Sequence, residues 1–443
     1  MPDSLAYRRL GVAAATISFF LSQATVAAPP MPRVEVIAEW NRLSYDLGDA
    51  AAEKAYQDNG TYKKVLLQGV KLDSKGNIYV STARWGGPEI PATLSKLVKK
   101  DGQWLLQPYP SLALNKVGDP KALQAVLGFE IDRNDVMWIL DQGHIAGKPS
   151  EPGAEKLVLW DINGNREIQR YEFSDKDSDK NCSFLNDVNV DNDTGFAYIT
   201  DSGIFCDPLD GGLIVYDSKN NRARRVLDRT VFTNDEAGFV FRIDNRPVLQ
   251  KTPMRTGADG IALSGDKKTL YWTNLTGHAL YALDTALLRD FNTSEAELRT
   301  SVKRVATLPS NTDGMTCDSQ NNLFMTALQL NGVMLRDAKT GEVSTYVSHP
   351  DMSWPDTLAW GPDGNLYLVT GHLHLWVDGS MTLISRPVQI SAFGRFKQIA
   401  RAIPLNNERR ACWIDGEEAT SCHFTYCSTR SGLWKGIDGR ARP

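Results

Sequence analysis

One pattern recurs six times along the chain, and it restricts the fold more than any other feature. Each copy has a short alternating segment, a polar turn and a segment rich in aromatic and β-branched residues, the pattern of a β-hairpin. Segments 186–191 and 197–199 form one such copy. Successive copies begin 59, 59, 73, 54 and 43 residues apart. Each interval has room for four short strands, which predicts an all-β fold, a six-bladed β-propeller.

The segments outside the six copies complete this domain picture. Residues 34–37 alternate in polarity, and we expect this N-terminal strand to close the last blade so that no sheet edge stays open. Segments 46–57 and 284–304 are expected to be helical, the second as an insertion between blades. The propeller is placed at 29–393. Residues 394–443, with three cysteines, form a C-terminal extension outside the repeat.

The first 28 residues have the layout of a cleavable signal peptide. Arg8 and Arg9 precede an apolar stretch over 10–21, and small residues surround the expected cleavage site near Ala27. We therefore expect a secreted protein, extracellular or, in a bacterium, periplasmic. No later stretch is typical of a membrane helix. The 49 Lys and Arg residues against 53 Asp and Glu argue against nucleic acid or a membrane surface as partner.

Six cysteines, an even number, fit an exported protein with disulfides. Cys182 and Cys206 flank one strand–turn segment, so we expect them to pair. Cys317 is expected in a strand as a small buried side chain. One bridge is expected among the three tail cysteines, Cys412, Cys422 and Cys427. In a eukaryotic host the protein would be a glycoprotein, because five sequons begin at Asn59, Asn181, Asn192, Asn274 and Asn292.

The first position of each repeat copy is expected to face the central axis. These positions are Gln68, Leu127, Asn186, Asp259, Asp313 and Asp356. Carboxylates that converge in one funnel repel each other unless a cation or a hydrogen-bonding ligand joins them. Oxygen ligands of this type suit Ca²⁺ or another divalent cation. A purely structural role is the alternative, because Asp and Asn at strand starts also cap backbone amides.

Histidine and aromatic residues supply the other candidates. His144 and His372 could act as proton acceptors, and His374 would share a face with His372 if both lay in one strand. Sequence motifs of serine hydrolases, zincins and P-loop enzymes do not occur. Five aromatic residues near the repeat motifs could stack on a flat ligand or hold an amine: Trp85, Phe129, Phe184, Trp272 and Trp354.

Several segments resemble the major royal jelly protein and Yellow family. The resemblance is carried by residues 34–41, 106–110, 185–188, 198–203, 211–217 and 259–264, and it extends over about 34–390. It implies a secreted six-bladed propeller, in agreement with the repeat count. It also implies a range of roles, since members of the family are linked to dopachrome conversion, to the binding of biogenic amines, or to storage and signalling.

A second, more distant resemblance is to the SMP30/gluconolactonase-type propellers. It rests on Asn186-Asp187, Asp259-Gly260 and Asp313-Gly314-Met315, which are similar to that group's metal and substrate motifs. It implies a metal site formed by Asp259, Asp313 and Asn186. Two positions depart from the group: Gln68 stands where a glutamate ligand is expected, and Phe184 where a substrate-binding arginine is expected.

These observations lead to two hypotheses. In the first, the protein is an isomerase of the dopachrome-tautomerase type or a metal-dependent lactonase. In the second, it is a non-catalytic binding protein for amines or phenolics. Either way the partner is a small polar or aromatic molecule, bound by Gln68, Asn186, Asp187, Asp356 and Phe184. Storage or structural use, which needs no pocket, is a third alternative.

Overall fold

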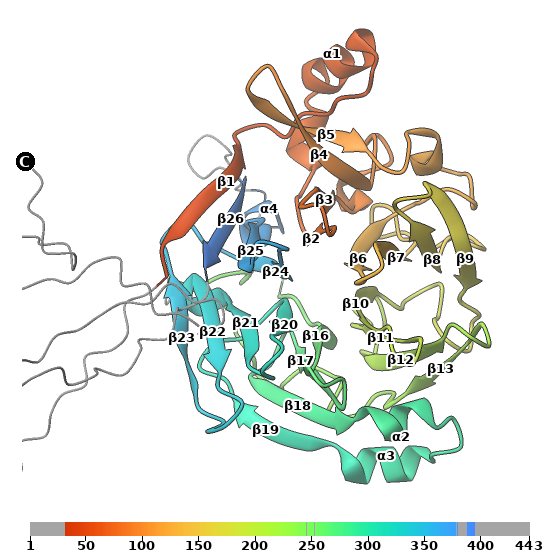
Figure 1. Cartoon of the computed structure of the whole chain (residues 1–443), viewed down its shortest axis with the longest axis vertical. Helices are drawn as coiled ribbons and strands as arrows, with labels where there is room; N and C mark the ends of the chain where they lie inside the picture. Colours follow the sequence, from red (N-terminus) through yellow and green to blue (C-terminus); the bar gives the residue numbers. More distant parts are fainter. Residues whose placement is uncertain (1–31, 245, 252, 378, 380–387, 395–443) are drawn as a thin grey trace, which may run out of the picture. The chain divides into compact units, whose positions relative to one another are not determined.

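Six four-stranded antiparallel sheets form the fold. The computed structural model describes residues 32–244, 246–251, 253–377, 379 and 388–394. The sheets are arranged around a central axis as the blades of a propeller, with β2, β6, β10, β16, β20 and β24 innermost (Figure 1). The predicted signal peptide lies outside the described residues, and so does the C-terminal extension apart from Gly394, which belongs to the last strand of the propeller.

The first three blades follow the chain in order. Blade 1 contains β2 (Val70–Leu72), β3 (Ile78–Ser81), β4 (Leu94–Lys100) and β5 (Gln103–Pro108). Blade 2 contains β6 (Val126–Ile131), β7 (Val136–Asp141), β8 (Lys156–Asp161) and β9 (Arg166–Glu172). Blade 3 contains β10 (Leu185–Asp191), β11 (Phe196–Asp201), β12 (Gly212–Asp217) and β13 (Arg222–Val226). The two-stranded β14 (Arg242–Ile243) and β15 (Arg246–Pro247) follow before blade 4.

The remaining blades complete the ring. Blade 4 contains β16 (Ala258–Leu263), β17 (Thr269–Asn274), β18 (Ala279–Asp284) and β19 (Lys303–Thr307). Blade 5 contains β20 (Met315–Cys317), β21 (Leu323–Ala327), β22 (Gly332–Arg336) and β23 (Val343–Ser348). Blade 6 contains β24 (Pro355–Trp360), β25 (Asn365–Thr370), β26 (Val388–Gly394) and β1 (Val34–Trp40).

The N-terminal strand closes the last blade, as predicted. β1 pairs antiparallel with β26, from Val34 opposite Phe393 to Trp40 opposite Val388. Two indoles then join this blade to blade 1: the Trp40 Nε1–H donates to the Trp104 carbonyl at 2.7 Å, and the Trp104 Nε1–H donates to the Ile37 carbonyl at 3.0 Å. Blades 6 and 1 are therefore held together by side chains as well as by the closing strand.

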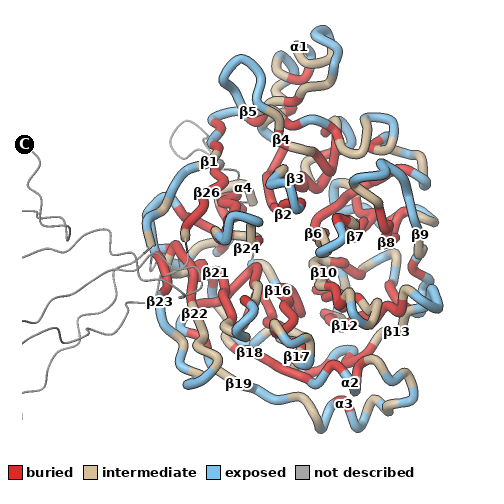
Figure 2. The backbone as a smooth tube through the Cα atoms, viewed as in Figure 1, coloured by how far each residue is buried: buried red, intermediate tan, exposed pale blue. Residues whose placement is uncertain are grey.

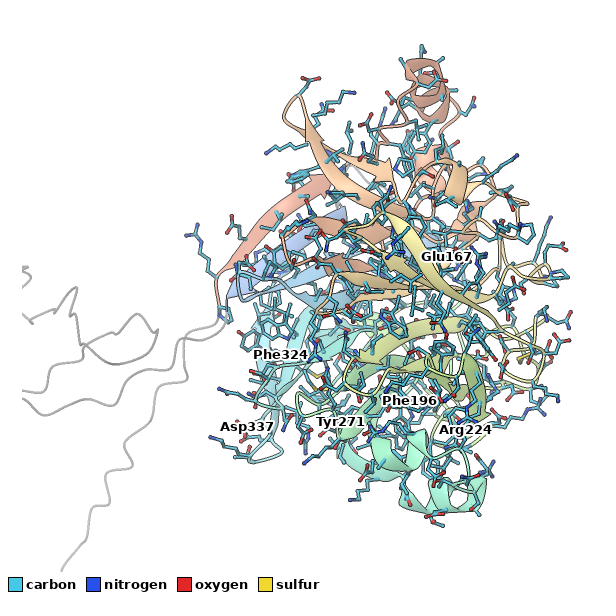
Figure 3. The ribbon with its side chains drawn as sticks, turned by 45° about the vertical axis from the view of Figure 1, so that its right-hand side comes forward. Glu167, Phe196, Arg224, Tyr271, Phe324 and Asp337 are labelled. Atoms are coloured by element: carbon cyan, nitrogen blue, oxygen red, sulfur yellow. A yellow bond between two sulfur atoms is a disulfide. The ribbon has the colours of Figure 1, made fainter. Side chains whose placement is uncertain are left out.

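Helices are few in the described part of the chain. They are α1 (Ala50–Asp58), α2 (Thr285–Arg289), α3 (Glu295–Ser301) and α4 (Leu373–Val377), with single 3₁₀ turns at Thr61–Lys64, Arg84–Gly86, Ala113–Asn115 and Leu328–Leu330. The prediction that the helical insertion 284–304 lies between two blades is wrong. The insertion joins β18 to β19, which are neighbours within blade 4. Arg224 of β13 fixes it by donating to the carbonyls of Leu287, Leu288 and Thr293 (Figure 3).

Burial differs between the strands of a blade. The inner and middle strands are buried, whereas the outer strands β9, β19 and β23 are exposed over much of their length (Figure 2). Apolar side chains of neighbouring blades pack together; one cluster joins Tyr198 of blade 3 to Trp272 of blade 4. In the described part of the chain, no helix is both long and apolar enough to cross a membrane.

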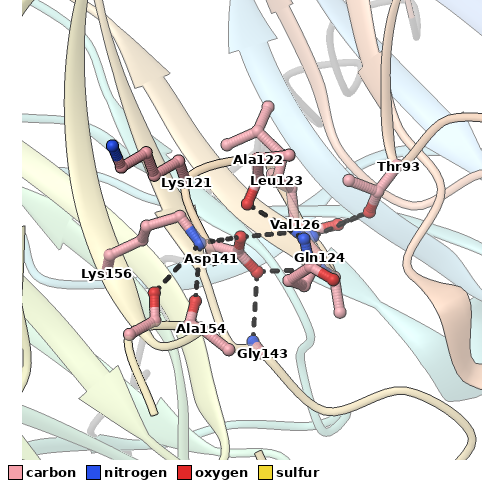
Figure 4. A network of polar contacts seen from close by, with 12 residues as sticks. Thr93, Lys121, Ala122, Leu123, Gln124, Val126, Asp141, Gly143, Ala154 and Lys156 are labelled. Carbon is pink, nitrogen blue, oxygen red and sulfur yellow. Dashed lines mark hydrogen bonds and ion pairs between the residues drawn. The ribbon is translucent and has the colours of Figure 1, made fainter. Parts of the chain in front are cut away.

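A buried ion pair organises blade 2 (Figure 4). The Lys156 ammonium lies 2.9 Å from Asp141 Oδ2, and both side chains are fully buried. Asp141 also accepts hydrogen bonds from the backbone amides of Gln124, Ala125 and Gly143. The carboxylate therefore joins β7 and β8 to the loop that precedes the inner strand.

The cysteine and sequon predictions have mixed outcomes. Cys182 and Cys206 form the predicted disulfide. Cys317 is a free cysteine at the end of β20 and is half-buried rather than buried. Asn274 is a poor glycan acceptor because it is buried and its amide donates to the Asn234 carbonyl at 2.6 Å. Asn59, Asn181 and Asn292 are exposed.

Candidate functional site

The axial residues of five blades line one cavity. Asn186, Asp259, Asp313 and Asp356 line this cavity of about 260 Å³, together with Leu127. This is slightly below the ~300–1,000 Å³ of drug-sized ligand pockets, so the cavity suits a small molecule. The repeat alignment thus correctly brings these positions together.

A β-bulge aims these side chains. In blades 2, 3, 4 and 6 the pairing of the inner strand gains one extra residue at its start, between Val126 and Phe129 in blade 2 and between Leu185 and Val188 in blade 3. The same irregularity occurs at Ala258–Ile261 and Pro355–Leu358. Bulges commonly redirect side chains next to functional sites. Here the axial residue of each of these blades lies inside the bulge.

Glycines allow the inner strands to approach one another. A Cβ on Gly128 would lie 2.4 Å from the Asn186 carbonyl oxygen of the next blade. On Gly260 it would lie 2.1 Å from the Asp313 carbonyl oxygen, and on Gly314 it would lie 2.4 Å from the Asp356 carbonyl oxygen. The glycines that follow Leu127, Asp259 and Asp313 therefore set how closely the next axial residue approaches. The glycines of the Asp-Gly pairs thus have a packing role beside any role in turns.

The wall of the cavity is apolar and rich in aromatic rings. Trp85 and Phe184 lie 5.8 Å apart between ring centroids, and Phe184 and Phe205 lie 5.6 Å apart. Trp376 of α4 and Met254 also line the wall. The disulfide joins the segments that carry Phe184 and Phe205, since Cys182 and Cys206 are two residues and one residue away from them. The covalent link therefore restrains two of the four rings.

The floor is a hydrogen-bonded set of carboxyl groups. The Asn186 amide nitrogen donates to Asp259 Oδ2 at 2.7 Å. The Asp259 and Asp313 carboxyls hydrogen-bond to each other, and the Trp354 indole donates to Asp313 Oδ2 at 2.8 Å. Asp356 accepts from the Thr357 hydroxyl at 3.1 Å. Among the described residues, no Lys or Arg lines this cavity.

Burial makes these carboxyls hard to ionise. Desolvation raises the pKa of Asp313 to about 6, although the Trp354 indole and the Asp259 carboxyl act against that rise. Desolvation also raises the pKa of Asp259 well above its usual range, with the charges of Asp313 and Asp356 adding to the effect. The pKa of Asp356 is raised for the same reasons, burial and the nearby Asp313. The floor carboxyls therefore keep their protons to a higher pH than ordinary aspartates do, and a bound cation could replace these protons.

Two predicted ligand-binding residues are not among the residues that line the cavity. The side-chain Oε1 of Gln68 accepts a hydrogen bond from the Ala83 backbone N–H at 3.1 Å, and the Gln68 side chain is buried. The Asp187 carboxyl accepts a hydrogen bond from the backbone N–H of the next residue, Val188, at 2.8 Å. Burial raises the pKa of Asp187 to about 6, while the charge of Lys71 opposes the rise. Asp356, Asn186 and Phe184 do line the cavity.

The two predicted catalytic histidines are not among the lining residues either. His144 is buried behind Phe205, with ring centroids 5.0 Å apart; its Nδ1 bonds the Lys148 carbonyl at 2.7 Å and its Nε2 lies 3.4 Å from Glu155 Oε1. His372 and His374 do not share a strand face, because β25 ends at Thr370. His372 has a left-handed φ of 52°, and His374 lies in α4. Their catalytic role stays a prediction.

The aromatic candidates separate into three groups. Trp85 and Phe184 line the cavity, whereas Phe129 and Trp272 pack in the hydrophobic core. Trp354 lies below the floor. Phe205, Met254 and Trp376 were missed because they lie outside the repeat motifs. The one available signal was the position of Phe205 directly before a cysteine.

A divalent cation fits these groups only in part. The carboxylates of Asp259 and Asp313 and the side-chain oxygen of Asn186 could supply oxygen ligands. However, the side-chain nitrogen of Asn186 faces Asp259, where it donates a hydrogen bond. The side-chain oxygen of Gln68 already accepts a hydrogen bond from the Ala83 backbone N–H. Among the described residues, no group of three or more His, Cys, Asp and Glu side chains is arranged to hold a metal ion. The metal site remains a prediction.

Comparison with known sequences shows to which protein family the chain belongs. A family model described as major royal jelly protein matches residues 124–390, more than half of the chain. The chain belongs to the major royal jelly protein family. This confirms the resemblance that the sequence motifs indicated, and the matched region contains blades 2 to 5 and the strands β24 and β25 of blade 6.

Individual members of the royal jelly protein family are distant. Protein yellow from Drosophila madeirensis is 28% identical over 275 residues, which is 58% of this chain and 46% of that protein. Major royal jelly protein 2 from Apis mellifera is 24% identical over 267 residues, 57% of this chain and 55% of that protein. The chain spans about half the length of these relatives, so what they do is not transferred to it.

Solved structures with a similar backbone are more distant still. A luciferin-regenerating enzyme has 15% sequence identity and a TM-score of 0.48, covering 83% of this chain and 96% of that chain. A gluconolactonase from Xanthomonas campestris has 13% identity and a TM-score of 0.45, covering 74% and 86%. Similarity at this level carries no information about the activity of this family member.

Proposed function

We propose that the protein binds a small aromatic molecule that carries a positively charged amine. The observation that supports this is the placement of three carboxyl groups, those of Asp259, Asp313 and Asp356, at the floor of a largely apolar cavity. An ammonium group would supply the counter-charge that the floor lacks. The ligand ring would lie against Trp85, Phe184 and Phe205, where stacking and cation–π attraction are available.

Proton release is the expected signature of this mode of binding. Burial favours the protonated forms of Asp259 and Asp356, whose pKa values are raised well above the usual range. A bound ammonium group favours the ionised carboxylates and so lowers these pKa values. Binding of the amine should therefore release protons to the buffer, whereas binding of a neutral phenol should not.

Calorimetry with tyramine and p-cresol tests the proposal. The two probes share a phenol ring but differ in the amine. Tyramine should bind, with a heat that depends on the ionisation enthalpy of the buffer, and Asp313→Asn should weaken it at least tenfold. Asp363→Asn is the matched control, because Asp363 lies in an exposed turn of blade 6 and bonds only neighbouring groups. Equal affinity for p-cresol and tyramine would overturn the proposal.

A second candidate is proton-transfer catalysis of the tautomerase type. It is favoured by the hydrogen-bonded Asp259–Asp313 pair, because unequal pKa values in two adjacent carboxyls can make one an acid and the other a base. Asp313 would remove a proton from one atom of the substrate and Asp259 would give a proton to another, which leaves an isomer. Isomerisation of dopachrome, measured for the wild type and Asp259→Asn, tests this candidate; equal rates would reject it.

The metal-dependent lactonase hypothesis has less support, since the groups fit a cation only in part. Elemental analysis of protein purified without chelator, with a calcium titration by calorimetry, tests it directly. A stoichiometric ion that is lost in Asp313→Ala would favour it. No ion and no heat on adding calcium would reject it.

We also propose that the protein is secreted. The Cys182–Cys206 disulfide supports this, because disulfides persist in oxidising compartments. N-terminal sequencing of protein recovered from the medium or periplasm should show a mature chain that begins near residue 28. Retention of residues 1–28 in the recovered protein would contradict the predicted cleavage.

A further inference from the structure

Asn186 lines the cavity from within the bulge of β10, and its side chain is half-buried. Its side-chain nitrogen makes two hydrogen bonds, one to Asp259 Oδ2 at 2.7 Å and one to the hydroxyl oxygen of Ser202 at 3.0 Å. A primary amide nitrogen carries two hydrogens, so both are already donated to the protein. The nitrogen of Asn186 therefore has no hydrogen left for a ligand.

Ser202 fixes the direction in which this amide points. The Ser202 side chain is fully buried, and its hydroxyl donates to the Ala258 carbonyl at 2.7 Å. A hydroxyl has a single hydrogen, so toward Asn186 the Ser202 oxygen can only accept. The atom of Asn186 that faces Ser202 must therefore be the nitrogen and not the oxygen. This orientation does not depend on whether Asp259 is protonated.

The side-chain oxygen of Asn186 is consequently the free end of the amide. Among the described residues Oδ1 has no hydrogen-bond partner, although the side chain lines the cavity. The bonds of the nitrogen to Asp259 and Ser202 hold this oxygen in place. A carboxylate attracts any cation, whereas an uncharged amide oxygen favours only a group that brings an N–H or O–H donor. The cavity therefore presents one acceptor whose preference is chemical rather than electrostatic.

We propose that Asn186 is a specificity-determining residue that selects ligands with a primary ammonium group over ligands with a quaternary one. This inference rests on the proposed function, since it names the class of amine that the cavity accepts. A primary ammonium group has three N–H donors and can bond Oδ1 while it faces the carboxyls of Asp259 and Asp356. A trimethylammonium group has no N–H and would cover Oδ1 with methyl groups, which leaves a polar atom unpaired.

The aromatic wall by itself predicts the opposite preference. Trp85, Phe184 and Phe205 line the cavity, and cages of aromatic rings are typical sites for quaternary ammonium ligands. If cation–π attraction alone held the ligand, a trimethylated amine would bind at least as well as the primary amine. The order of the two affinities therefore distinguishes a site governed by its wall from a site in which Asn186 selects.

Calorimetry with tyramine and its N,N,N-trimethyl derivative measures this order. The wild type should bind tyramine about tenfold more tightly. Asn186→Leu keeps a side chain of similar size and removes Oδ1, so the two affinities should become nearly equal. The lost hydrogen bond to Asp259 affects both ligands alike and cancels in the ratio of the affinities. Asn189→Leu is the matched control, because Asn189 lies on the same strand, is half-buried and does not line the cavity. This control should keep the ratio of the wild type.

Ser202→Ala is the second variant, and it covers the case in which Asn186→Leu does not fold. It keeps Asn186 but removes the acceptor that orients the amide. The preference for tyramine should fall in this variant as well, because Oδ1 is no longer held toward the ligand. A role of Ser202 limited to packing would leave the ratio of the two affinities unchanged. Ser202 is thus a positioning residue that acts through Asn186.

The outcomes separate the inference from the proposed function. Equal affinity of the wild type for both amines would overturn the inference and leave the amine site intact. A preference for tyramine that survives in Asn186→Leu would also overturn it, because the size of the methyl groups would then explain the preference. If neither amine binds the wild type, the proposed function is rejected and the selectivity is rejected with it.

Discussion

Asp259, Asp313 and Asp356 hold a proton more tightly in the folded chain than in the unfolded chain, because burial raises the pKa of each. Between the unfolded and folded pKa values the folded state binds more protons, so stability falls as pH rises. For Asp313 the contribution is complete below about pH 4, the usual range of an aspartate, and is lost as pH rises through about 6. The groups that would bind a cation therefore weaken the empty protein at neutral pH.

Asp356→Asn should stabilise the protein more at pH 8 than at pH 4. The amide keeps the size of the side chain and removes a group that is costly to ionise next to Asp313. An increase in Tm of about 2–4 °C at pH 8 corresponds to ~1 kcal/mol in a large domain. Thermal unfolding followed by circular dichroism measures it. Asp363→Asn, in the exposed turn of the same blade, should change Tm equally at both pH values.

At the scale of strands and loops, the inner ring depends on close contact between backbones. The Gly260 position has no room for a side chain, because a Cβ there would lie 2.1 Å from the Asp313 carbonyl oxygen. The contact joins β16 of blade 4 to the segment before β20 of blade 5. Relief would require the backbone of one blade to move away from the other.

Gly260→Ala should therefore lower the free energy of unfolding by about 2–4 kcal/mol, in the range of severe overpacking and backbone strain. It should also weaken tyramine binding, because Asp313 would move. Gly277→Ala is the control in the same blade: a Cβ there meets nothing closer than 3.5 Å. Urea unfolding of the two variants checks the difference. Similar stability of both would mean that the inner strands adapt to the extra methyl group.

The buried Lys156–Asp141 pair makes a second prediction at this scale. Removing one partner leaves the other charge buried without its counter-ion, which typically costs ~3–5 kcal/mol. Lys156→Met and Asp141→Asn should each destabilise the protein strongly. The double variant should cost less than the sum of the two, and urea unfolding of the cycle measures the coupling. The exposed pair Lys54–Asp58, treated in the same way, should show little coupling. If the losses of stability in the two single variants simply add up in the double variant, the two side chains are not coupled and the prediction is wrong.

For the whole molecule, ring closure is the feature on which all blades depend. β1 comes from the start of the described chain and completes blade 6, and residues 44–46 then run beside β5 of blade 1, with hydrogen bonds of 2.9 Å between Asp46 and Leu106 and between Leu106 and Ser44. The indoles of Trp40 and Trp104 hold β1 against blade 1 through their hydrogen bonds. The N-terminal segment thus joins the two blades between which the chain closes.

Trp104→Phe should loosen the closure without changing the interior of the cavity. Loss of one indole hydrogen bond costs about 1 kcal/mol, so Tm should fall by a few degrees. Limited proteolysis should then cut residues 34–46 at a lower protease concentration than in the wild type. Lys99→Gln removes the ammonium that lies 5.4 Å from the Trp104 ring centroid but keeps both indole bonds, and should behave like the wild type. Unchanged proteolysis of Trp104→Phe would show that backbone pairing alone closes the ring.

The repeat in the sequence determined the number of blades, the closing strand and the axial positions, because each depends on a local pattern of alternating residues and turns. The sequence also indicated the Cys182–Cys206 disulfide correctly. Gln68 and Asp187 were expected to bind the ligand from the same alignment, but they do not line the cavity. Bulges and neighbouring charges determine the direction of such side chains. Neither can be recognised from the alternation of residues in a strand.

Only the tertiary structure determined the character of the cavity. Its wall combines Phe205, Met254 and α4, which come from segments that share no repeat and meet only because the ring closes. The indole donated to Asp313 comes from another blade, 41 residues further along the chain. The raised pKa values come from the removal of water around carboxyls that would be ordinary in an unfolded chain. Periodicity is local and can be read from the chain, whereas desolvation and contacts between distant segments exist only in the folded molecule.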